Sequence, residues 1–343
     1  MAREQRPLLV LDGGMGHLLK ARCAAVAGLP YEQQFLAGVL ALKASPGDVA
    51  AAHAAYVAAG CDVITTNSFA ATRHSLAKVG RAGDAAALAA RAGALARAAA
   101  DAPGRRVLVA GSLPPLRESY QCAGLPNDAA LASEYAELAD ALAPHVDLFL
   151  AETLSTAAEA HAALQATAGR GKPVWVSFTL EDSARARLRG GEPLAEAAAG
   201  LAAQGHAAAV LVNCCAPGAA AAALPVLLRH APPGALVGCY ANGFRTTTSA
   251  WLRGGEADEA GAELLQPDPG EYDAEGAITP AAYLGHALAW RAAGACIIGG
   301  CCGVGPEHMA LLAAAAREAA GGGGGAEAGG DAGGAGGGDG REG

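Results

Sequence analysis

Residues 295–319 read ACIIGGCCGVGPEHMALLAAAAREA, and this stretch contains one complete structural unit of the chain. It opens with a short apolar run at 295–298 and continues, after a segment rich in glycine and cysteine, into an alanine-rich stretch with helical spacing at 306–319. An uninterrupted apolar run is typical of a parallel strand that is buried on both faces. Gly305 and Pro306 form a helix-start signal. The stretch therefore predicts a strand, a loop and a helix, in that order.

The same unit recurs along the whole chain. Short apolar runs occur at 8–11, 63–66, 107–110, 148–151, 174–177, 209–212, 235–238 and 295–298. Alanine-rich stretches with helical spacing occur at 47–59, 84–100, 128–143, 157–166 and 306–319. Eight strand–helix units predict an α/β protein with a (β/α)8 barrel, and about 310 residues suit one such barrel. An open, doubly wound sheet is the alternative that this alternation allows.

The domain organisation follows from where the alternation ends. We expect residues 1–320 to form a single barrel domain. Residues 321–343 are almost entirely glycine and alanine with scattered acidic residues, so we predict a disordered tail that buries no core. Two intervals in the barrel, 18–44 and 244–276, are longer than the others. Both follow strands, so both are expected over the carboxyl-end rim, where the active sites of such barrels lie.

Composition and charge narrow the class of protein. Hydrophobic residues make up 52% of the 343 residues and charged residues 17%, which is enough apolar sequence for a large core. The 33 acidic residues outnumber the 24 basic ones, so we expect neither nucleic acid nor a membrane surface as a partner. The sequence has no apolar run of transmembrane length, and its polar start is too short for a signal peptide. We therefore expect a cytoplasmic protein, in which the nine cysteines bind metal or react as thiols.

Polar and reactive residues are concentrated directly after the predicted strands. These segments are 12–16 (DGGMG), 65–69 (TTNSF), 152–153 (ET), 213–215 (NCC), 240–243 (YANG) and 299–303 (GGCCG). In a barrel the carboxyl ends of all strands converge on one mouth, so the segments are expected to form a single site.

Three cysteines at these strand ends have the pattern of a metal site. Cys301 and Cys302 are adjacent and flanked by glycines, and Cys214 lies at the end of a strand two positions away around the expected barrel. Three thiolates with one open position suit a tetrahedral Zn²⁺ ion that accepts a further ligand from a substrate. The pattern alone leaves two alternatives. The thiols could be buried as small hydrophobic groups, and Cys215 could take the place of Cys214.

Two acidic residues and two asparagines are further candidate site residues. Asp12 and Glu152 place carboxylates at the expected mouth, where such groups commonly bind a ligand. Alternatively, Asp12 caps the loop after the first strand and Glu152 caps the helix after the fourth. Asn67 and Asn242 could equally bind a substrate or hold loops through their amide groups.

Five motifs, in the same order along the chain, resemble those of the zinc-dependent homocysteine S-methyltransferases, a family that includes the S-methylmethionine and betaine enzymes. The matching segments are 12–16, 66–69, 151–153, 212–214 and 299–303. The resemblance covers about 310 residues and implies a (β/α)8 barrel, in agreement with the strand pattern. It also implies Zn²⁺ as the cofactor, with Cys214, Cys301 and Cys302 as the metal ligands in preference to Cys215.

The resemblance implies a reaction as well, the transfer of a methyl group to the thiol of L-homocysteine to give methionine. Asp12 and Glu152 are then the expected catalytic residues, because they hold the amino-acid part of homocysteine. Asn67 and Asn242 are the further expected substrate-binding residues.

The methyl donor is expected to be cationic, because a neutral thioether is a poor leaving group. We predict S-methylmethionine, since a betaine donor would call for an aromatic cage and Trp251 is the one tryptophan expected near the mouth. Segment 240–243 resembles a Tyr-Pro-Asn element of the S-methylmethionine enzymes, with Ala241 in place of proline, and Gly303 stands where many relatives have arginine. The alternatives are a betaine-dependent enzyme, a methyltransferase for selenocysteine or another thiol, and a zinc-binding or redox-sensing barrel without catalysis.

Overall fold

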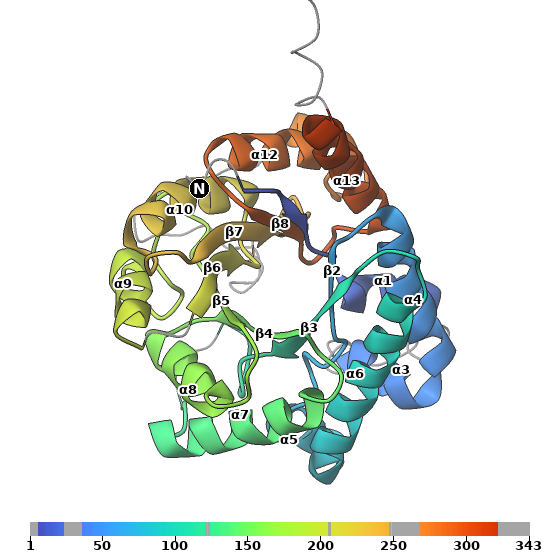
Figure 1. Cartoon of the computed structure of the whole chain (residues 1–343), viewed down its shortest axis with the longest axis vertical. Helices are drawn as coiled ribbons and strands as arrows, with labels where there is room; N and C mark the ends of the chain where they lie inside the picture. Colours follow the sequence, from blue (N-terminus) through green and yellow to red (C-terminus); the bar gives the residue numbers. More distant parts are fainter. Residues whose placement is uncertain are drawn as a thin grey trace, which may run out of the picture.

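The strands form one parallel sheet that curves into a ring (Figure 1). The computed structural model describes residues 6–23, 36–120, 122, 124–204, 207–246, 248 and 268–321. Neighbouring strands follow the order β1-β8-β7-β6-β5-β4-β3-β2. The strands are β1 (Leu9–Val10), β2 (Val63–Thr65), β3 (Leu108–Leu113), β4 (Leu148–Leu154), β5 (Val174–Thr179), β6 (Ala207–Asn213), β7 (Leu236–Ala241) and β8 (Ile297–Gly300).

The ring closes between the first two strands. Leu11 forms a parallel bridge with Val63. The Asp12 N–H donates to the Val63 carbonyl over 3.1 Å, and the Asp62 N–H donates to the Val10 carbonyl over 2.7 Å. Each strand is thus joined to two neighbours. The predicted (β/α)8 barrel is confirmed, and the open, doubly wound sheet is excluded.

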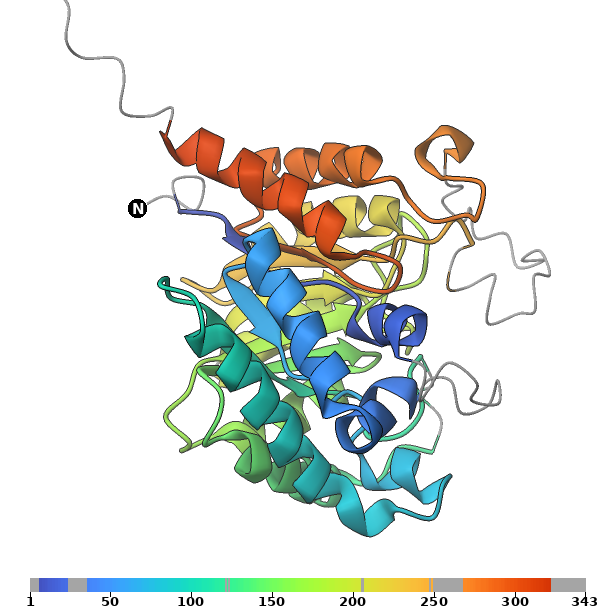
Figure 2. The same ribbon diagram turned by 90° about the vertical axis from the view of Figure 1, so that its right-hand side faces the viewer.

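Helices surround the ring, except that the first helix lies at the end where the strands terminate (Figures 1 and 2). They are α1 (Met15–Arg22), α3 (Ala37–Ala44), α4 (Pro46–Ala59), α5 (Arg73–Ala77), α6 (Ala85–Asp101), α7 (Asp128–Leu142), α8 (Ala157–Thr167), α9 (Leu194–Gln204), α10 (Pro217–His230), α12 (Pro280–Ala292) and α13 (Pro306–Gly321), with short 3-10 turns η3 (Ala82–Asp84) and η4 (Pro269–Glu271). Side-chain caps fix several starts. The Asn127 side chain accepts from the Ala130 N–H before α7, and Thr156 and Glu159 form a capping box at α8.

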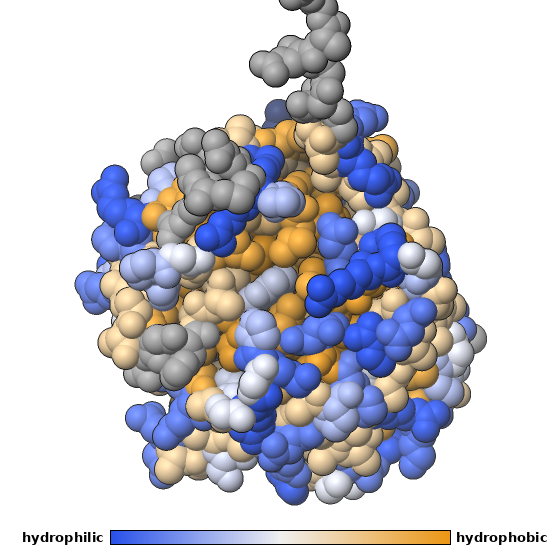
Figure 3. All heavy atoms as spheres, in the orientation of Figure 1, coloured by the Kyte–Doolittle hydropathy of each residue, from blue (hydrophilic) through white to orange (hydrophobic). Residues whose placement is uncertain are grey.

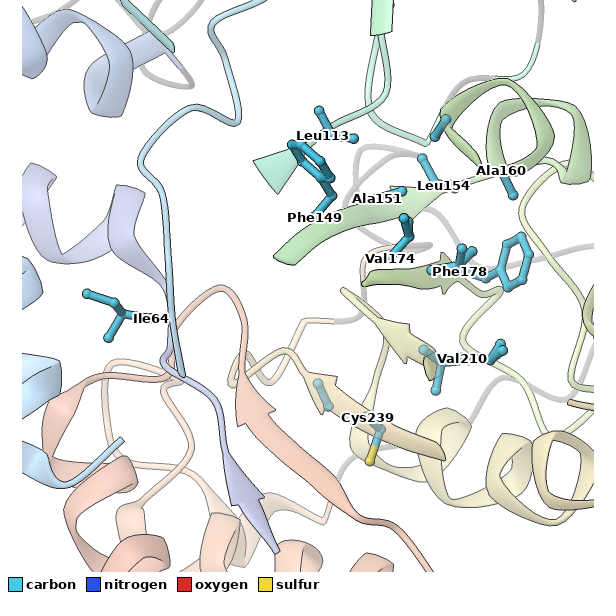
Figure 4. Close-up of a cluster of buried hydrophobic side chains, with 14 of the residues drawn as sticks. Ile64, Leu113, Phe149, Ala151, Leu154, Ala160, Val174, Phe178, Val210 and Cys239 are labelled. Carbon is cyan, nitrogen blue, oxygen red and sulfur yellow. The ribbon is translucent and has the colours of Figure 1, made fainter. Parts of the chain in front are cut away.

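Hydrophobic side chains fill two layers, one inside the ring and one between strands and helices. Strand β4 contributes to both, since Leu150 belongs to the inner cluster, whereas Phe149 belongs to the outer cluster, which includes Ala160 of α8 (Figure 4). Successive side chains of a strand point to opposite faces, so burial of both faces requires continuous apolar runs. Trp175 of β5 lies in the inner layer.

The two ends of the barrel differ. In Figure 2 the strands run from left to right, and α1 and η4 lie at the end where the strands terminate. Figure 3 shows the opposite end, where hydrophobic side chains gather at the centre of the face and hydrophilic ones lie around them. The loops that carry the predicted site residues therefore leave the barrel at the end opposite to the face in Figure 3.

Some of the expected features lie outside the described residues. These are 24–35 and 249–267 within the two long intervals, with Tyr31 and Trp251 among them, and 322–343 of the predicted tail. Helix α13 ends at Gly321, the first residue of that predicted tail. Within the part of the chain that the structure describes, no helix combines the length and the apolar composition needed to cross a membrane.

Candidate functional site

Three cysteine thiols meet at the carboxyl end of the barrel. Cys214 directly follows β6, and Cys301 and Cys302 directly follow β8. The three Sγ atoms all lie within 4.8 Å of one another, and those of Cys214 and Cys301 are 2.8 Å apart. The neighbouring Cys215 is fully buried and is not a member of this group. The trio is the one that the sequence favoured, and it could hold a metal ion.

Strand β7 lies between the two cysteine segments in the sheet and is bonded to both. The backbone bonds run from the Cys214 N–H to the Tyr240 carbonyl (3.3 Å), from the Cys301 N–H to the Ala241 carbonyl (2.9 Å) and from the Gly243 N–H to the Cys302 carbonyl (2.7 Å). The hydrogen bonds that continue the barrel past its strand ends therefore also set the spacing of the thiols.

The cysteine segments need unusual backbone conformations and close approaches. Cys214 has a left-handed φ of 54° and Gly303 one of 79°. A Cβ added to Gly14 would lie 2.5 Å from the carbonyl oxygen of Cys301, and one on Gly303 would lie 2.8 Å from the Phe244 ring. Glycine at these two positions lets the loops after β1 and β7 pack directly on the segment that carries the cysteine pair.

The three thiols influence one another's ionisation. Hydrogen bonds from Cys214 and Cys301 hold the pKa of Cys302 well below its ordinary value. The hydrogen bond with Cys214 raises the pKa of Cys301 well above its ordinary value. Binding of a metal to all three sulfurs requires their thiolate forms and would release the remaining thiol protons.

The Glu152 carboxyl lies on β4 and is 8% exposed. It accepts a hydrogen bond of 2.5 Å from the Ser112 hydroxyl and one of 3.1 Å from the Tyr240 hydroxyl. Burial raises the pKa of Glu152 to about 7. The cap of the following helix, α8, is formed by Thr156 with Glu159. Glu152 therefore does not cap that helix, which was one of the two interpretations of its sequence position.

Asp12 follows the first strand and is also buried. Its two carboxylate oxygens accept hydrogen bonds from Thr65, one of 2.7 Å from the backbone N–H and one of 2.9 Å from the hydroxyl. Burial, with a smaller contribution from the charge of Glu152, raises the pKa of Asp12 to about 7 against the effect of these bonds. Asp12 thus joins the ends of β1 and β2, and it places a second carboxyl in electrostatic range of Glu152.

The two predicted asparagines both contact loops. The Asn67 amide donates to the Gly38 carbonyl over 2.7 Å, which attaches the end of β2 to α3. The Asn242 amide donates to the Thr248 hydroxyl over 2.9 Å. Among the described residues the Asn242 Oδ1 atom has no hydrogen-bond partner, although this side chain is buried. Asn242 therefore retains a hydrogen-bond acceptor that a ligand could use.

Thr65 and Tyr240 lie in segments that were expected at the site, but the sequence did not reveal their supporting roles, and it did not single out Ser112 or Tyr120. Ser112 and Tyr240 orient Glu152, and Thr65 orients Asp12. Ser112 could have been found, because it shares a strand face with the inward-facing Ala110 and is a polar residue in an apolar run. Tyr120, whose hydroxyl donates to the Cys214 sulfur over 3.2 Å, lies in the loop after β3 and carries no comparable signal.

These features define a class of enzyme, a closed α/β barrel whose strand ends carry a cluster of three thiols for a metal and two buried carboxyls. A sequence profile of the homocysteine S-methyltransferase family matches residues 9–316. The chain therefore belongs to the homocysteine S-methyltransferase family and is a methyltransferase.

Solved structures agree with this assignment. The chain is similar to the metallated form of the homocysteine methyltransferase MmuM from Escherichia coli, with 26% identity and a TM-score of 0.70 over 91% of this chain and 97% of that one. The oxidised form of MmuM gives 26% identity and a TM-score of 0.71 over 92% and 98% of the two chains. The apo form of MmuM gives 25% identity and a TM-score of 0.62 over 91% of this chain and 97% of that one.

Proposed function

We propose that the enzyme transfers a methyl group from S-methylmethionine to the thiol of L-homocysteine at a zinc ion held by Cys214, Cys301 and Cys302. The observation that carries the proposal is the meeting of the three Sγ atoms within 4.8 Å of one another. They lie at the barrel end that also carries the carboxyls of Asp12 and Glu152.

The donor set fits zinc. Three thiolates are soft ligands that suit Zn²⁺, and a set of three leaves one tetrahedral position open, as in catalytic zinc sites. Zn–S bonds of about 2.3 Å separate tetrahedral sulfur ligands by roughly 3.8 Å. The Sγ atoms of this cluster all lie within 4.8 Å of one another, and those of Cys214 and Cys301, now 2.8 Å apart, would separate by about 1 Å to join such a set.

The reaction needs an ionised acceptor thiol. A free thiol has a pKa of about 8.5 and is a poor nucleophile while protonated. When bound, zinc supplies a fourth coordination position and lowers the pKa of the thiol that enters it. A lone pair of the homocysteine sulfur forms the new S–CH3 bond while the S–CH3 bond of the donor breaks. Its electron pair stays on the donor sulfur, so the sulfonium charge is neutralised and the donor leaves as methionine.

The carboxyls orient the acceptor in this proposal. The Ser112 and Tyr240 hydroxyls fix the direction of the Glu152 carboxyl, which is suited to accept hydrogen bonds from the homocysteine ammonium group. An adjacent cation lowers the pKa of a carboxyl, so the ammonium would favour the ionised form of Glu152, whose pKa burial has raised to about 7. Asp12, held by Thr65, adds a second negative charge for the same ammonium.

The choice of donor rests on its own chemistry and on the polar groups at the mouth. S-Methylmethionine carries an amino-acid end that the Oδ1 atom of Asn242, which has no partner among the described residues, and the amide of Asn67 are suited to bind. Near the cysteines the Phe244 ring packs against His17, with ring centroids 4.9 Å apart, and lies over Gly303. A quaternary ammonium donor is best held by several open aromatic faces, whereas two rings described near the cysteines are already in contact, Phe244 with His17 and Tyr120 with Arg189.

Parallel kinetics with S-methylmethionine, S-adenosylmethionine and betaine test the proposal. We expect the highest kcat/KM with S-methylmethionine, loss of methionine formation after zinc is chelated, and recovery when zinc is returned. Equal or higher kcat/KM with betaine would overturn the choice of donor. Full activity after removal of the metal would overturn the role of the cysteine cluster. Selenocysteine in place of homocysteine tests the acceptor in the same assay.

A further inference from the structure

The side chain of Tyr120 connects the cysteine cluster to a buried ion pair. Its hydroxyl donates a hydrogen bond of 3.2 Å to the Cys214 sulfur. The guanidinium carbon of Arg189 lies 5.0 Å from the centroid of the Tyr120 ring. A cation over an aromatic face stabilises the position of the ring. Arg189 therefore helps to keep the Tyr120 hydroxyl directed at the Cys214 sulfur.

The cation is itself held in place. Arg189 pairs with Asp182 over 3.3 Å, and their side chains are 6% and 0% exposed. The other Asp182 oxygen accepts a hydrogen bond of 2.6 Å from the Ala216 N–H, two residues after Cys214. One buried ion pair therefore braces both the Tyr120 ring and the turn that carries Cys214.

A third link acts on Cys214 directly. The Thr179 hydroxyl donates to the Cys214 carbonyl over 3.3 Å, and its oxygen accepts a hydrogen bond of 3.4 Å from Arg189. The backbone, the following turn and the sulfur of Cys214 are thus each held by a member of one connected group. This group brings together the loops after β3, β5 and β6, which are far apart in the sequence.

Backbone strain is concentrated at the same place. Within the described residues, the non-glycine residues with a left-handed φ are Tyr120 (68°), Thr153 (61°), Ala186 (48°) and Cys214 (54°). Two of them are the partners of the hydroxyl–sulfur bond. Conformations of this kind persist only where the surrounding contacts enforce them, and they are concentrated at functional sites.

We propose that Tyr120 is a positioning residue of the metal centre, whose hydroxyl donates to the Cys214 thiolate and withdraws charge from that ligand. The inference rests on the metal site of the proposed function. A ligand sulfur that accepts a hydrogen bond is a weaker electron donor and has a fixed direction. Less negative charge on the three protein sulfurs favours the entry of a fourth, anionic sulfur from the acceptor substrate.

Replacement of the native metal by Co²⁺ provides a readout that does not depend on turnover, because sulfur-to-cobalt charge transfer reports the energy of the sulfur lone pairs. Tyr120→Phe removes only the hydroxyl, so we expect its charge-transfer band to move to longer wavelength than in wild type. Tyr135→Phe is the matched control, since the Tyr135 hydroxyl is buried without a partner among the described residues. Its band is expected to coincide with that of wild type. A Tyr120→Phe spectrum identical to wild type would overturn the proposal.

A second measurement tests the proposal if the Tyr120→Phe protein fails to fold or to bind cobalt. Fluorotyrosine placed at position 120 keeps the ring and makes its hydroxyl a stronger donor. We expect the band to move to shorter wavelength, with no shift when fluorotyrosine is placed at position 135. The absence of a shift at position 120 would overturn the role of Tyr120. Failure of the wild-type protein to bind cobalt or zinc would instead overturn the metal centre itself, so the two failures are distinguishable.

Discussion

The Glu152 carboxyl is bonded by two hydroxyl groups and largely removed from water. We predict that Glu152→Ala lowers kcat/KM for homocysteine by about 10- to 100-fold, the equivalent of roughly 1.5–3 kcal/mol for a hydrogen bond to a charged group. The metal content stays unchanged, because Glu152 is not one of the clustered thiols. Steady-state kinetics and metal analysis check both points. Glu196→Ala, which removes an exposed carboxyl from α9, is the control. Unaltered kcat/KM in Glu152→Ala would exclude its contact with substrate.

The raised pKa of Glu152 also makes stability depend on pH. The ordinary pKa is 4.5 and the folded-state pKa is about 7, so the folded protein holds the proton more tightly. This contribution favours folding at low pH and is lost as the pH rises through 7. We predict that Glu152→Gln gains stability relative to wild type between pH 5 and pH 8, by at most about 3 kcal/mol. Urea denaturation at both pH values, at equal metal content, measures the difference. A difference that does not change with pH would contradict the prediction.

The cysteines allow a test by single replacement. We expect Cys214→Ser, Cys301→Ser and Cys302→Ser each to lose most of the bound metal, because an alcohol is a much poorer zinc ligand than a thiolate. Cys215→Ser is the neighbouring control and keeps its metal, since that side chain lies outside the cluster. Metal analysis after gel filtration gives the result. Full metal content in Cys301→Ser, or a larger loss in Cys215→Ser than in Cys214→Ser, would contradict the assignment.

Among the elements, β7 has a role beyond its place in the barrel, because hydrogen bonds from its end reach both cysteine segments. The loop after β1 approaches one of these segments from the other side, and only glycine fits at the contact. We predict that Gly14→Ala lowers metal affinity by at least about tenfold, the lower end of the range for residues that support metal ligands. Its added methyl group would lie 2.5 Å from the Cys301 carbonyl oxygen and must displace that segment.

Gly16→Ala is the matched control for Gly14→Ala. A Cβ at Gly16 has nothing within 4 Å, and this residue lies in α1, where alanine is tolerated better than glycine. Competition with a zinc chelator compares the two variants with wild type. Equal metal affinity in Gly14→Ala and Gly16→Ala would show that the close contact is not needed to hold the cysteine pair.

The elements themselves were largely predictable from the sequence. The five predicted helices begin and end within two residues of α4, α6, α7, α8 and α13. Burial on both faces produces continuous apolar runs for the strands. Asn127 and the Pro residues mark helix starts. Both signals lie within a few consecutive residues, so they can be recognised in the sequence alone. The clustering of Cys214 with Cys301 and Cys302 was predictable because barrel geometry brings strand ends together.

Contacts between loops were not predictable in this way. The pairing of Asp182 with Arg189 and the approach of Tyr120 to Cys214 depend on how separate loops fold over the rim. No periodicity or spacing records such a contact. The identities of the metal and of the methyl donor stay predictions for a related reason. The sequence pattern locates the residues of the site but does not specify their contacts with a bound ion or donor.

At the scale of the whole molecule, the chain after α13 is expected to contribute little. We predict that a protein ending at Gly321, which lacks residues 322–343, keeps the thermal midpoint and kcat/KM of the full chain. The deleted residues are mostly glycine, alanine and acidic residues, which have little apolar surface to bury. Thermal denaturation and steady-state kinetics of the two proteins test this. A midpoint lower by several degrees would show that the segment packs on the barrel.

The segment that follows β7 starts and ends at neighbouring positions. Phe244 forms an antiparallel β-bridge with Ala277, and the Ile278 N–H donates to the Gly243 carbonyl over 2.7 Å. A segment whose two ends already meet can change its length and sequence during evolution while the strands beneath it keep their positions. The three clustered thiols lie outside this segment, on the residues that follow β6 and β8. Variation between Phe244 and Ala277 therefore leaves the segments that hold Cys214, Cys301 and Cys302 in place.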